Sequence, residues 1–224
     1  YNMANYAIIP SGGVGKRINS SLPKQYIKIK GKELIAYTLE IFQKCESIDK
    51  IIVAAQAEYF QLFEEIKNKY GITKLFKVVE GGKERQNSVY NALMASEASD
   101  NDLIVVHDAA RPLLSQEILK SAITEAEKFD NVVVAIKATD TLISGNDFVE
   151  RYLDRSTTYQ VQTPQISRFE NLVKSMRSSF NSNFIGTDES ILLYNSSYKI
   201  RIVNGSSMNF KVTTDSDLDL FKII

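Results

Sequence analysis

The chain has 224 residues, of which 44% are hydrophobic, and its 27 Lys and Arg residues balance 27 Asp and Glu residues. This size and apolar content suffice for one substantial core, and the balanced charge gives no sign of nucleic acid or membrane as a general partner. The single Cys and single His exclude a disulfide framework within the chain and a zinc site built from these residue types. Because the sequence has neither a signal-type segment nor an apolar stretch of about 18 residues, we expect a cytoplasmic protein.

Short apolar runs rich in β-branched residues alternate with amphipathic segments along the chain. The runs predict strands at Tyr6–Pro10, Ile51–Ala55, Phe76–Val79, Leu103–Val106, Val132–Ile136 and Ile200–Val203. The amphipathic segments predict helices at Leu34–Gln43, Glu58–Tyr70, Gln86–Ala98 and Gln116–Phe129. This alternation is typical of a mostly parallel sheet with helices on both faces, so we predict a single α/β domain over residues 3–224.

One polar segment, residues 137–165, breaks the alternation. Its pattern predicts a β-arm that protrudes from the main sheet and returns to it. An isolated two-stranded ribbon is only marginally stable, so we expect this arm to pair with a second subunit. An ordinary surface hairpin is the alternative.

A glycine-rich loop follows the first predicted strand, with the sequence Pro10-Ser-Gly-Gly-Val-Gly-Lys-Arg. Glycines at a strand end let backbone N–H groups approach phosphate oxygens closely. Lys16, Arg17 and Lys24 add positive charge that suits a triphosphate. The loop matches neither the P-loop nor the dinucleotide-binding fingerprint. A tight turn with exposed lysines is the alternative.

A second glycine pair, Gly81 and Gly82, lies between a predicted strand and a predicted helix. It again indicates a backbone loop that holds a ligand, with Arg85 and Ser88 facing the same cleft. A simple strand-to-helix connection would need the same turn, so the motif alone does not decide between these interpretations.

The third motif, His107-Asp-Ala-Ala-Arg-Pro, stands at the carboxyl end of an apolar strand, where ligands of open α/β sheets bind. Asp108 is placed to coordinate Mg²⁺, which uses one or two carboxylates together with phosphates. Arg111 would support Asp108 or contact phosphate, and Ala109 leaves room for a bulky ligand. We favour a structural role for His107 over that of a catalytic base.

Near the carboxyl terminus, Lys211 is predicted to lie on an apolar strand, where an inward-facing lysine would need an anion. Thr213 or Thr214, together with Asp217, is predicted to cap a closing helix.

Together these motifs resemble the cytidylyltransferase family that includes 2-C-methyl-D-erythritol 4-phosphate cytidylyltransferase. The resemblance covers almost the whole chain, from Ile8 to Leu220, and keeps the order of the family's motifs. Its motifs are the glycine loop with Arg17, Pro23-Lys-Gln-Tyr, Gly81-Gly-Lys-Glu-Arg-Gln-Asn-Ser-Val, His107-Asp-Ala-Ala-Arg-Pro, Asp140-Thr, Asp154-Arg, Gln162-Thr-Pro-Gln, Thr187-Asp-Glu and Lys211-Val-Thr.

The resemblance implies a Rossmann-like fold, Mg²⁺ as cofactor, a homodimer built through the arm, and transfer of CTP's nucleotidyl group to a sugar- or polyol-phosphate. It assigns catalysis to Arg17, Lys24 and Lys211. It assigns nucleotide binding to Pro10, Ser11, Gly12, Gly13, Gly81, Gly82, Arg85, Ser88 and Ala109. It assigns the acceptor to Asp108, Arg111, Thr141, Arg155 and Thr187, with Asp108 also at the metal and the arm residues Thr141 and Arg155 serving the neighbouring subunit.

The acceptor is predicted to be 2-C-methyl-D-erythritol 4-phosphate, with D-ribitol 5-phosphate as the alternative. Ser11-Gly12 replaces the two alanines usual in the methylerythritol form, and Tyr159-Gln-Val-Gln-Thr-Pro-Gln resembles the ribitol enzymes. The motifs at His107 and Thr187 resemble the methylerythritol enzyme instead. A non-catalytic nucleotide-binding module and a transferase that uses UTP or ATP are further alternatives.

Overall fold

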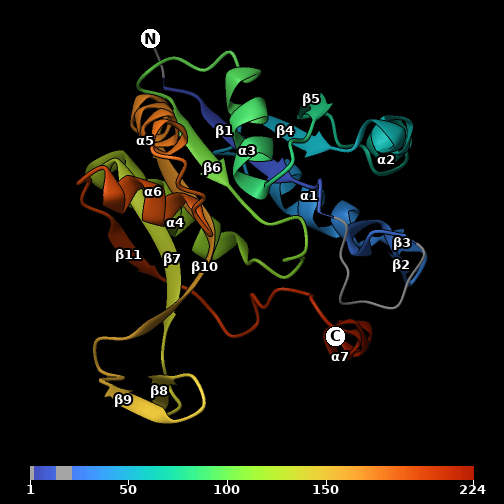
Figure 1. Cartoon of the computed structure of the whole chain (residues 1–224). Helices are drawn as coiled ribbons and strands as arrows, with labels where there is room; N and C mark the ends of the chain where they lie inside the picture. The colour runs from blue at the N-terminus through green and yellow to red at the C-terminus, as the bar shows by residue number, and fades with distance from the viewer. Residues whose placement is uncertain (1–2, 14–21) are drawn as a thin grey trace.

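The computed structural model describes residues 3–13 and 22–224, and its centre is a seven-stranded sheet (Figure 1). The strand order is β11-β7-β10-β6-β1-β4-β5. The strands are β1 (Asn5–Pro10), β4 (Lys50–Ala55), β5 (Leu75–Glu80), β6 (Leu103–Val106), β7 (Asn131–Lys137), β10 (Tyr159–Arg168) and β11 (Arg201–Asn204). Only β10 runs antiparallel to its neighbours in this sheet. The mostly parallel α/β sheet predicted from the alternating pattern is therefore confirmed.

Helices cover both faces of the sheet. The longer ones are α1 (Leu34–Lys44), α2 (Phe60–Tyr70), α3 (Arg85–Met94), α4 (Gln116–Phe129), α5 (Phe169–Asn181), α6 (Glu189–Asn195) and α7 (Asp215–Ile223). Two single-turn helices, η1 (Lys24–Tyr26) and η2 (Ala57–Tyr59), and the short hairpin β2 (Lys28–Ile29) and β3 (Lys32–Glu33) complete the main body.

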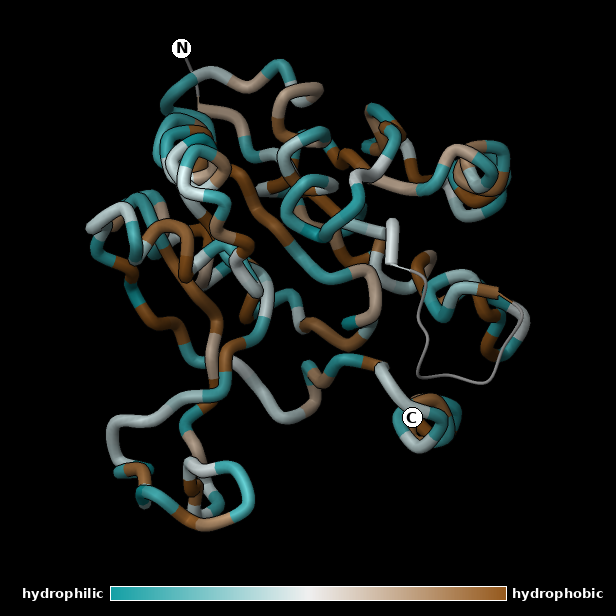
Figure 2. Tube along the Cα trace, in the orientation of Figure 1, coloured by the Kyte–Doolittle hydropathy of each residue, from teal (hydrophilic) through white to brown (hydrophobic). Residues whose placement is uncertain are grey.

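Alternation along the strands divides the core between the two faces. In β1, Ala7 and Ile9 pack with the buried side chains of α1, α2 and α4, whereas Tyr6 and Ile8 pack with those of α3, α5 and α6. The strands are brown over most of their length in Figure 2, because both of their faces are covered. A third, smaller cluster holds α7 against the β2–β3 hairpin through residues such as Ile29 and Phe221.

The predicted elements agree with the structure to within a few residues, with three exceptions. The helix expected over Gln86–Ala98 ends at Met94, and Glu97 adopts a positive φ of 63°. Lys211, expected on a strand, lies in a loop between β11 and α7. The third exception is the stretch after the arm, where β10, α5 and α6 had no predicted counterpart, because their apolar residues are interrupted by serines and asparagines.

The arm projects from the sheet as the separate hairpin β8 (Leu142–Gly145) and β9 (Val149–Leu153), at the bottom of Figure 1. Residues 159–165 of the predicted arm instead belong to β10 and pair with β7 and β6. The arm is thus shorter than predicted, and the strand that returns from it enters the centre of the sheet. No helix in the described part of the chain is both long and apolar enough to cross a membrane.

Candidate active site

The site lies at the carboxyl edge of the parallel strands. Because β1, β4, β5 and β6 run in one direction, the loops that follow β1, β5 and β6 meet at this edge. Backbone bonds continue the sheet into the loops: Ser11 N–H donates to the carbonyl of Ala54 (2.7 Å), and Gly81 N–H donates to that of Ala55 (2.8 Å). The three motifs recognised in the sequence are therefore neighbours in space.

The two glycine loops lie against each other at Ser88. A Cβ added at Gly12 would lie 3.3 Å from Ser88 Oγ, and one at Gly81 would lie 3.1 Å from the same atom. A Cβ at Gly82 would collide with Asn87. Since Ser88 Oγ also accepts the N–H of Gly82 (3.0 Å), the close packing of the two loops is what favours glycine at these positions.

Gln25 fixes the first glycine loop from below. Its side chain is buried, and Nε2 donates to the carbonyls of Ser11 (2.7 Å) and Gly13 (2.9 Å). Tyr26 OH is also within hydrogen-bond distance of Ser11 Oγ (3.1 Å). These bonds fix the position of the loop. The conformation of the loop therefore depends on η1, which carries Gln25 and Tyr26.

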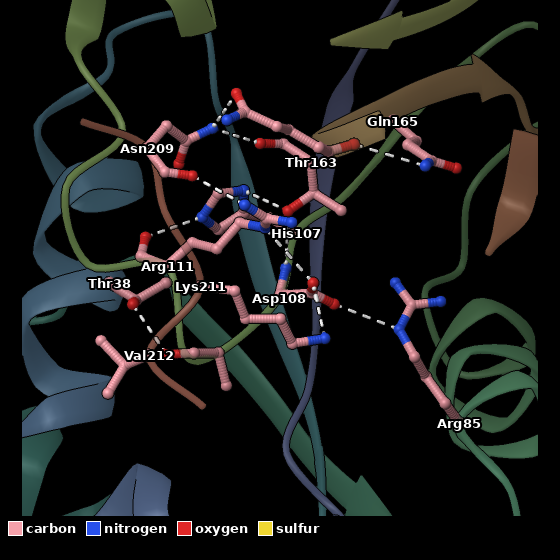
Figure 3. Close-up of polar contacts among 12 residues, drawn as sticks. Thr38, Arg85, His107, Asp108, Arg111, Thr163, Gln165, Asn209, Lys211 and Val212 are labelled. Atoms are coloured by element: carbon pink, nitrogen blue, oxygen red, sulfur yellow. Dashed lines mark hydrogen bonds and ion pairs between the residues drawn. The ribbon is translucent and has the colours of Figure 1, made fainter. Parts of the chain in front are cut away.

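Asp108 is the centre of the polar network in Figure 3. Its Oδ2 lies 3.0 Å from Lys211 Nζ and 3.4 Å from Arg111 Nε, and its Oδ1 lies 3.2 Å from Arg85 Nε. Burial raises the pKa of this carboxyl, but Arg85, Lys211 and Arg111 together hold the pKa well below its usual range. Asp108 is therefore an anion that both binds and aligns three cationic side chains.

His107 is a structural residue, as favoured from the sequence. It is completely buried, with Nδ1 3.0 Å from Thr163 Oγ1 and Nε2 3.0 Å from the carbonyl of Arg111. Burial lowers the pKa of His107 to about 4, so the ring is neutral near pH 7. With both nitrogens engaged inside the protein, the imidazole is not available as a base.

The loop that carries Lys211 is held against the loop that follows β6. Val212 N–H donates to the carbonyl of Ala110 (2.8 Å), and the carbonyl of Val212 accepts from Lys24 Nζ (2.8 Å). Asn209, fully buried, donates through Nδ2 to the carbonyl of Thr163 (2.8 Å). Lys24 and Lys211, distant in sequence, are brought to the same wall of the site by these bonds.

Thr214 caps α7 as predicted. It forms a capping box with Asp217, and the N–H and Oγ1 of Thr213 also donate to Asp217 Oδ2 at 2.7 and 2.8 Å. The cap fixes the point at which the Lys211 loop ends.

Two cavities meet at the Asp108 network. The larger, of about 380 Å³, is lined by Pro10, Ser11, Gly12, Gly13, Lys24, Gln25, Gly82, Lys83, Glu84, Arg85, Ser88, Asp108, Ala109, Ala110, Lys211 and Thr213. The smaller, of about 150 Å³, is lined by Arg85, Asp108, Arg111, Val161, Gln162, Thr163, Gln165, Thr187, Asp188 and Lys211. The residues common to both, Arg85, Asp108 and Lys211, form the boundary between them.

This arrangement brings together most of the predicted site residues, including the nucleotide set in the larger cavity and Arg111 and Thr187 in the smaller one. Gly81 lies directly beside the larger cavity through its contact with Ser88. The arm residues Thr141 and Arg155 are exposed and line neither cavity of the described chain. Arg17 lies outside the described residues.

Four residues in the site were not assigned a role from the sequence: Gln25, Thr163, Glu189 and Asn209. Gln25, Thr163 and Glu189 belong to motifs that were recognised, and Asn209 lies two residues before one. Each acts by binding another residue of the site that lies outside its own motif. Motif spacing could not reveal such contacts.

The fit of a divalent cation depends on Asp108. Among the described residues, no group of three or more His, Cys, Asp or Glu side chains is arranged to hold a metal ion. A single carboxylate that faces the cavity is nevertheless what Mg²⁺ needs when phosphate oxygens and water complete its shell. The donor set of this site therefore suits a metal that arrives with phosphates.

Glycine loops line the larger cavity together with Lys24, Arg85 and Lys211, a combination that suits a polyphosphate. The smaller cavity, which Arg111 lines, offers room for a second phosphorylated molecule. The fold and the site define the class of nucleotide-binding α/β proteins with a phosphoryl-transfer site. Within that class, residues 5–224 match the family model of 2-C-methyl-D-erythritol 4-phosphate cytidylyltransferase, and the chain belongs to this family.

Relatives and solved structures agree with this assignment. The chain is 36% identical to 2-C-methyl-D-erythritol 4-phosphate cytidylyltransferase of Clostridium acetobutylicum, over 96% of this chain and 94% of the relative. Its structure is similar to that of the Francisella tularensis protein of the same name, with a TM-score of 0.83, 31% identity and coverage of 98% and 99%. It is also similar to 4-diphosphocytidyl-2C-methyl-D-erythritol synthase from Anaerococcus prevotii, with a TM-score of 0.86, 25% identity and coverage of 99% and 97%.

Proposed function

We propose that this protein transfers the cytidylyl group of CTP to 2-C-methyl-D-erythritol 4-phosphate and releases pyrophosphate, as a step of isoprenoid precursor synthesis in the cytoplasm. The observation that carries the proposal is the junction of two cavities at Asp108, Lys211 and Arg85, in a chain whose family has this activity. The larger cavity holds CTP and the smaller one holds the acceptor.

CTP lies with its cytosine and ribose over the two glycine loops. The set proposed for nucleotide binding is Pro10, Ser11, Gly12, Gly13, Gly81, Gly82, Arg85, Ser88 and Ala109. The mutual packing of Gly12, Gly81 and Ser88 holds the two loops close together beside the proposed position of the base. Lys24 and Lys211, together with Arg17, neutralise the triphosphate.

The reaction is an in-line attack of the acceptor's phosphate oxygen on the α-phosphorus of CTP. That oxygen is already anionic, so the protein needs no general base, and burial of His107 agrees with this. Lys211 and Lys24 stabilise the charge that grows on the α-phosphate and on the departing pyrophosphate. Lys211 lies at the boundary of the cavities, next to the bond that forms.

Mg²⁺, held by Asp108 and the phosphates of CTP, would neutralise phosphate charge. The part played by the protein is to hold the Asp108 carboxylate in its ionised form, through Arg85, Arg111 and Lys211. An ionised carboxylate at pH 7 is ready to bind the metal without releasing a proton.

The acceptor lies against Asp108, Arg111 and Thr187, and a second subunit adds Thr141 and Arg155 from its arm. The β8–β9 hairpin carries strongly exposed apolar side chains, among them Phe148 (85% exposed) and Tyr152 (70% exposed). A two-stranded ribbon with such side chains is only marginally stable in water unless another chain covers it. These features support a homodimer formed through the arm.

The alternatives are less well supported. The relatives reported above are named for methylerythritol rather than ribitol substrates, although the Tyr159–Gln165 motif had suggested ribitol. A purely nucleotide-binding module is disfavoured because the family is one of transferases, and UTP or ATP is disfavoured because the family is named for cytidylyl transfer.

Pyrophosphate release in the presence of CTP and Mg²⁺ tests the proposal. Parallel reactions contain 2-C-methyl-D-erythritol 4-phosphate, D-ribitol 5-phosphate or no acceptor, and a second series replaces CTP by UTP, ATP or GTP. The proposal requires turnover with CTP and the methylerythritol compound. Faster turnover with the ribitol compound, or with UTP, would contradict it.

A further inference from the structure

Arg85, which lies at the junction of the cavities, binds two carboxylates. Its Nε donates to Asp108 Oδ1 (3.2 Å), while Nη1 and Nη2 donate to Glu189 Oε1 (2.6 Å) and Oε2 (3.0 Å). The second contact is bidentate, the geometry in which a guanidinium and a carboxylate bind most strongly and in a fixed orientation. Glu189 therefore determines where the guanidinium lies, and Asp108 accepts only the Nε–H of Arg85.

Glu189 does not contact either substrate cavity. Its residue is 2% exposed, and it is absent from the described residues that line the larger and the smaller cavity. It opens helix α6, immediately after Thr187 and Asp188, which do line the smaller cavity. Any effect of Glu189 on the reaction must consequently pass through Arg85 or through this turn.

The turn is fastened at further points. Gln86 Oε1 accepts the N–H of Gly186 (2.8 Å), and Gln165 Oε1 accepts the N–H of Ser190 (2.7 Å). Arg85 and Gln86 are consecutive in α3, the helix that begins beside the second glycine loop. Helix α3 thus holds the wall of the acceptor cavity through Arg85 and Gln86. The same turn of this helix also lines the larger cavity, which is assigned to CTP.

We propose that Glu189 is a positioning residue that couples the two halves of the site. It holds Arg85 where this side chain aligns Asp108 through Nε alone, so that the guanidinium does not occupy both oxygens of the Asp108 carboxylate. The inference rests on the proposed function. Without the negative charge of Glu189, Arg85 would turn its terminal nitrogens to Asp108, the nearest remaining carboxylate. Asp108 would then be less available to Lys211, Arg111 and a phosphate-bound cation, and the Thr187 wall would be held to α3 by the Gln86–Gly186 bond without the support of Arg85.

The test uses Glu189→Gln, which keeps the shape of the side chain and removes its charge. We expect kcat/KM for the acceptor to fall about tenfold to a hundredfold, as for loss of a charge-assisted hydrogen bond. The Kd of CTP, measured by calorimetry without acceptor, is expected to rise by a clearly smaller factor, because Arg85 is only one of the residues proposed to bind CTP and the base and ribose contact the glycine loops. The control is Glu97→Gln, which removes a surface ion pair with Lys77 and should leave both values unchanged.

A double-mutant cycle separates this role from a merely structural one. If Glu189 acts through Arg85, the double variant Arg85→Gln/Glu189→Gln should be no slower than Arg85→Gln alone. Removing both members of a buried ion pair also costs less stability than removing one, so the double variant tests the idea even if Glu189→Gln folds poorly. Additive losses, or equal losses in CTP binding and acceptor kcat/KM, would overturn the inference.

The wild type is assayed first. Lack of turnover with both acceptors would overturn the proposed function and this inference with it. Turnover by the wild type, combined with additive or uniform losses in the variants, would overturn the inference alone.

Discussion

Nζ of Lys211 lies 3.0 Å from Oδ2 of Asp108, so the ammonium group expected at the reacting phosphate is held by a carboxylate at the boundary of the two cavities. A cation in this position is already oriented before CTP binds. Its contribution to the rate should therefore be visible in kcat more than in the affinity for CTP.

We expect Lys211→Met to lower kcat for pyrophosphate release about a hundredfold, the usual cost of one lost charge-stabilising donor. The same change at Lys199, an exposed lysine far from the cavities, is the control. A steady-state assay that returned wild-type kcat with a raised KM for CTP would instead assign Lys211 to ground-state binding.

Gln25→Ala should loosen the first glycine loop, because two buried bonds to the carbonyls of Ser11 and Gly13 are lost. At about 1 kcal/mol for each bond, the Kd of CTP should rise on the order of tenfold or more. Calorimetric titration with CTP checks this, with Gln61→Ala on the exposed side of α2 as control. Equal affinities for CTP in the two variants would show that the loop keeps its shape without the two bonds from Gln25.

His107 is the only histidine in the sequence, so its titration can be followed by NMR without assignment. Burial lowers its pKa to about 4, below the unfolded value of about 6.5. The imidazole resonances should therefore not shift between pH 8 and pH 5.5. Since the unfolded chain binds this proton more readily, His107 reduces the free energy of unfolding as the pH falls below about 6.5. A midpoint near 6.5 would refute the structural role.

Asp108 should also contribute to acid sensitivity, at a lower pH than His107. Arg85, Lys211 and Arg111 lower its folded-state pKa despite burial, so its stabilising effect is present above the unfolded pKa of about 3.9 and is lost as the pH falls below it. Urea unfolding should show Asp108→Asn to be less stable than the wild type at pH 7, with a smaller difference at pH 3. A difference independent of pH would mean that the carboxylate's charge does not stabilise the fold.

The proposed exchange of arms can be tested by mixing inactive variants. Arg155→Ala removes an acceptor contact from the neighbour's site, whereas Lys211→Met disables its own site. Mixed dimers contain one intact site, so random pairing should restore about a quarter of the wild-type activity. Each variant mixed with itself is the control. If activity did not return after the subunits exchanged, Arg155 would not act across the dimer.

The sequence predicted the sheet well because its strands are apolar runs covered on both faces, such as Leu103–Val106. The region that contains β10, α5 and α6 was harder, since Asn171, Ser175 and Ser179 are buried polar residues and disturb the helical pattern of α5. Gln86, for example, donates to Ser179 Oγ at 2.7 Å, a contact that makes a buried serine favourable but that no local pattern reveals.

For the site, motif order was enough to bring Gly12, Gly81 and Asp108 to the same place, since each follows a parallel strand. Motif order did not show which side chains of the site bind one another. The Arg85–Glu189 pair spans 104 positions of sequence, and the arm was given too much of the chain because β10 carries polar residues into the sheet.

The path of β10 has a consequence for regulation by concentration. This strand starts where the arm ends, and within a few residues it delivers Thr163 to His107 and Gln162 to the loop before Lys211. In the homodimer proposed above, loss of the partner would free the arm, which joins one end of this strand, and the next residues of the strand support the reacting groups. Activity per chain should therefore fall as the protein is diluted, because one stretch of backbone connects the proposed dimer contact to the active site.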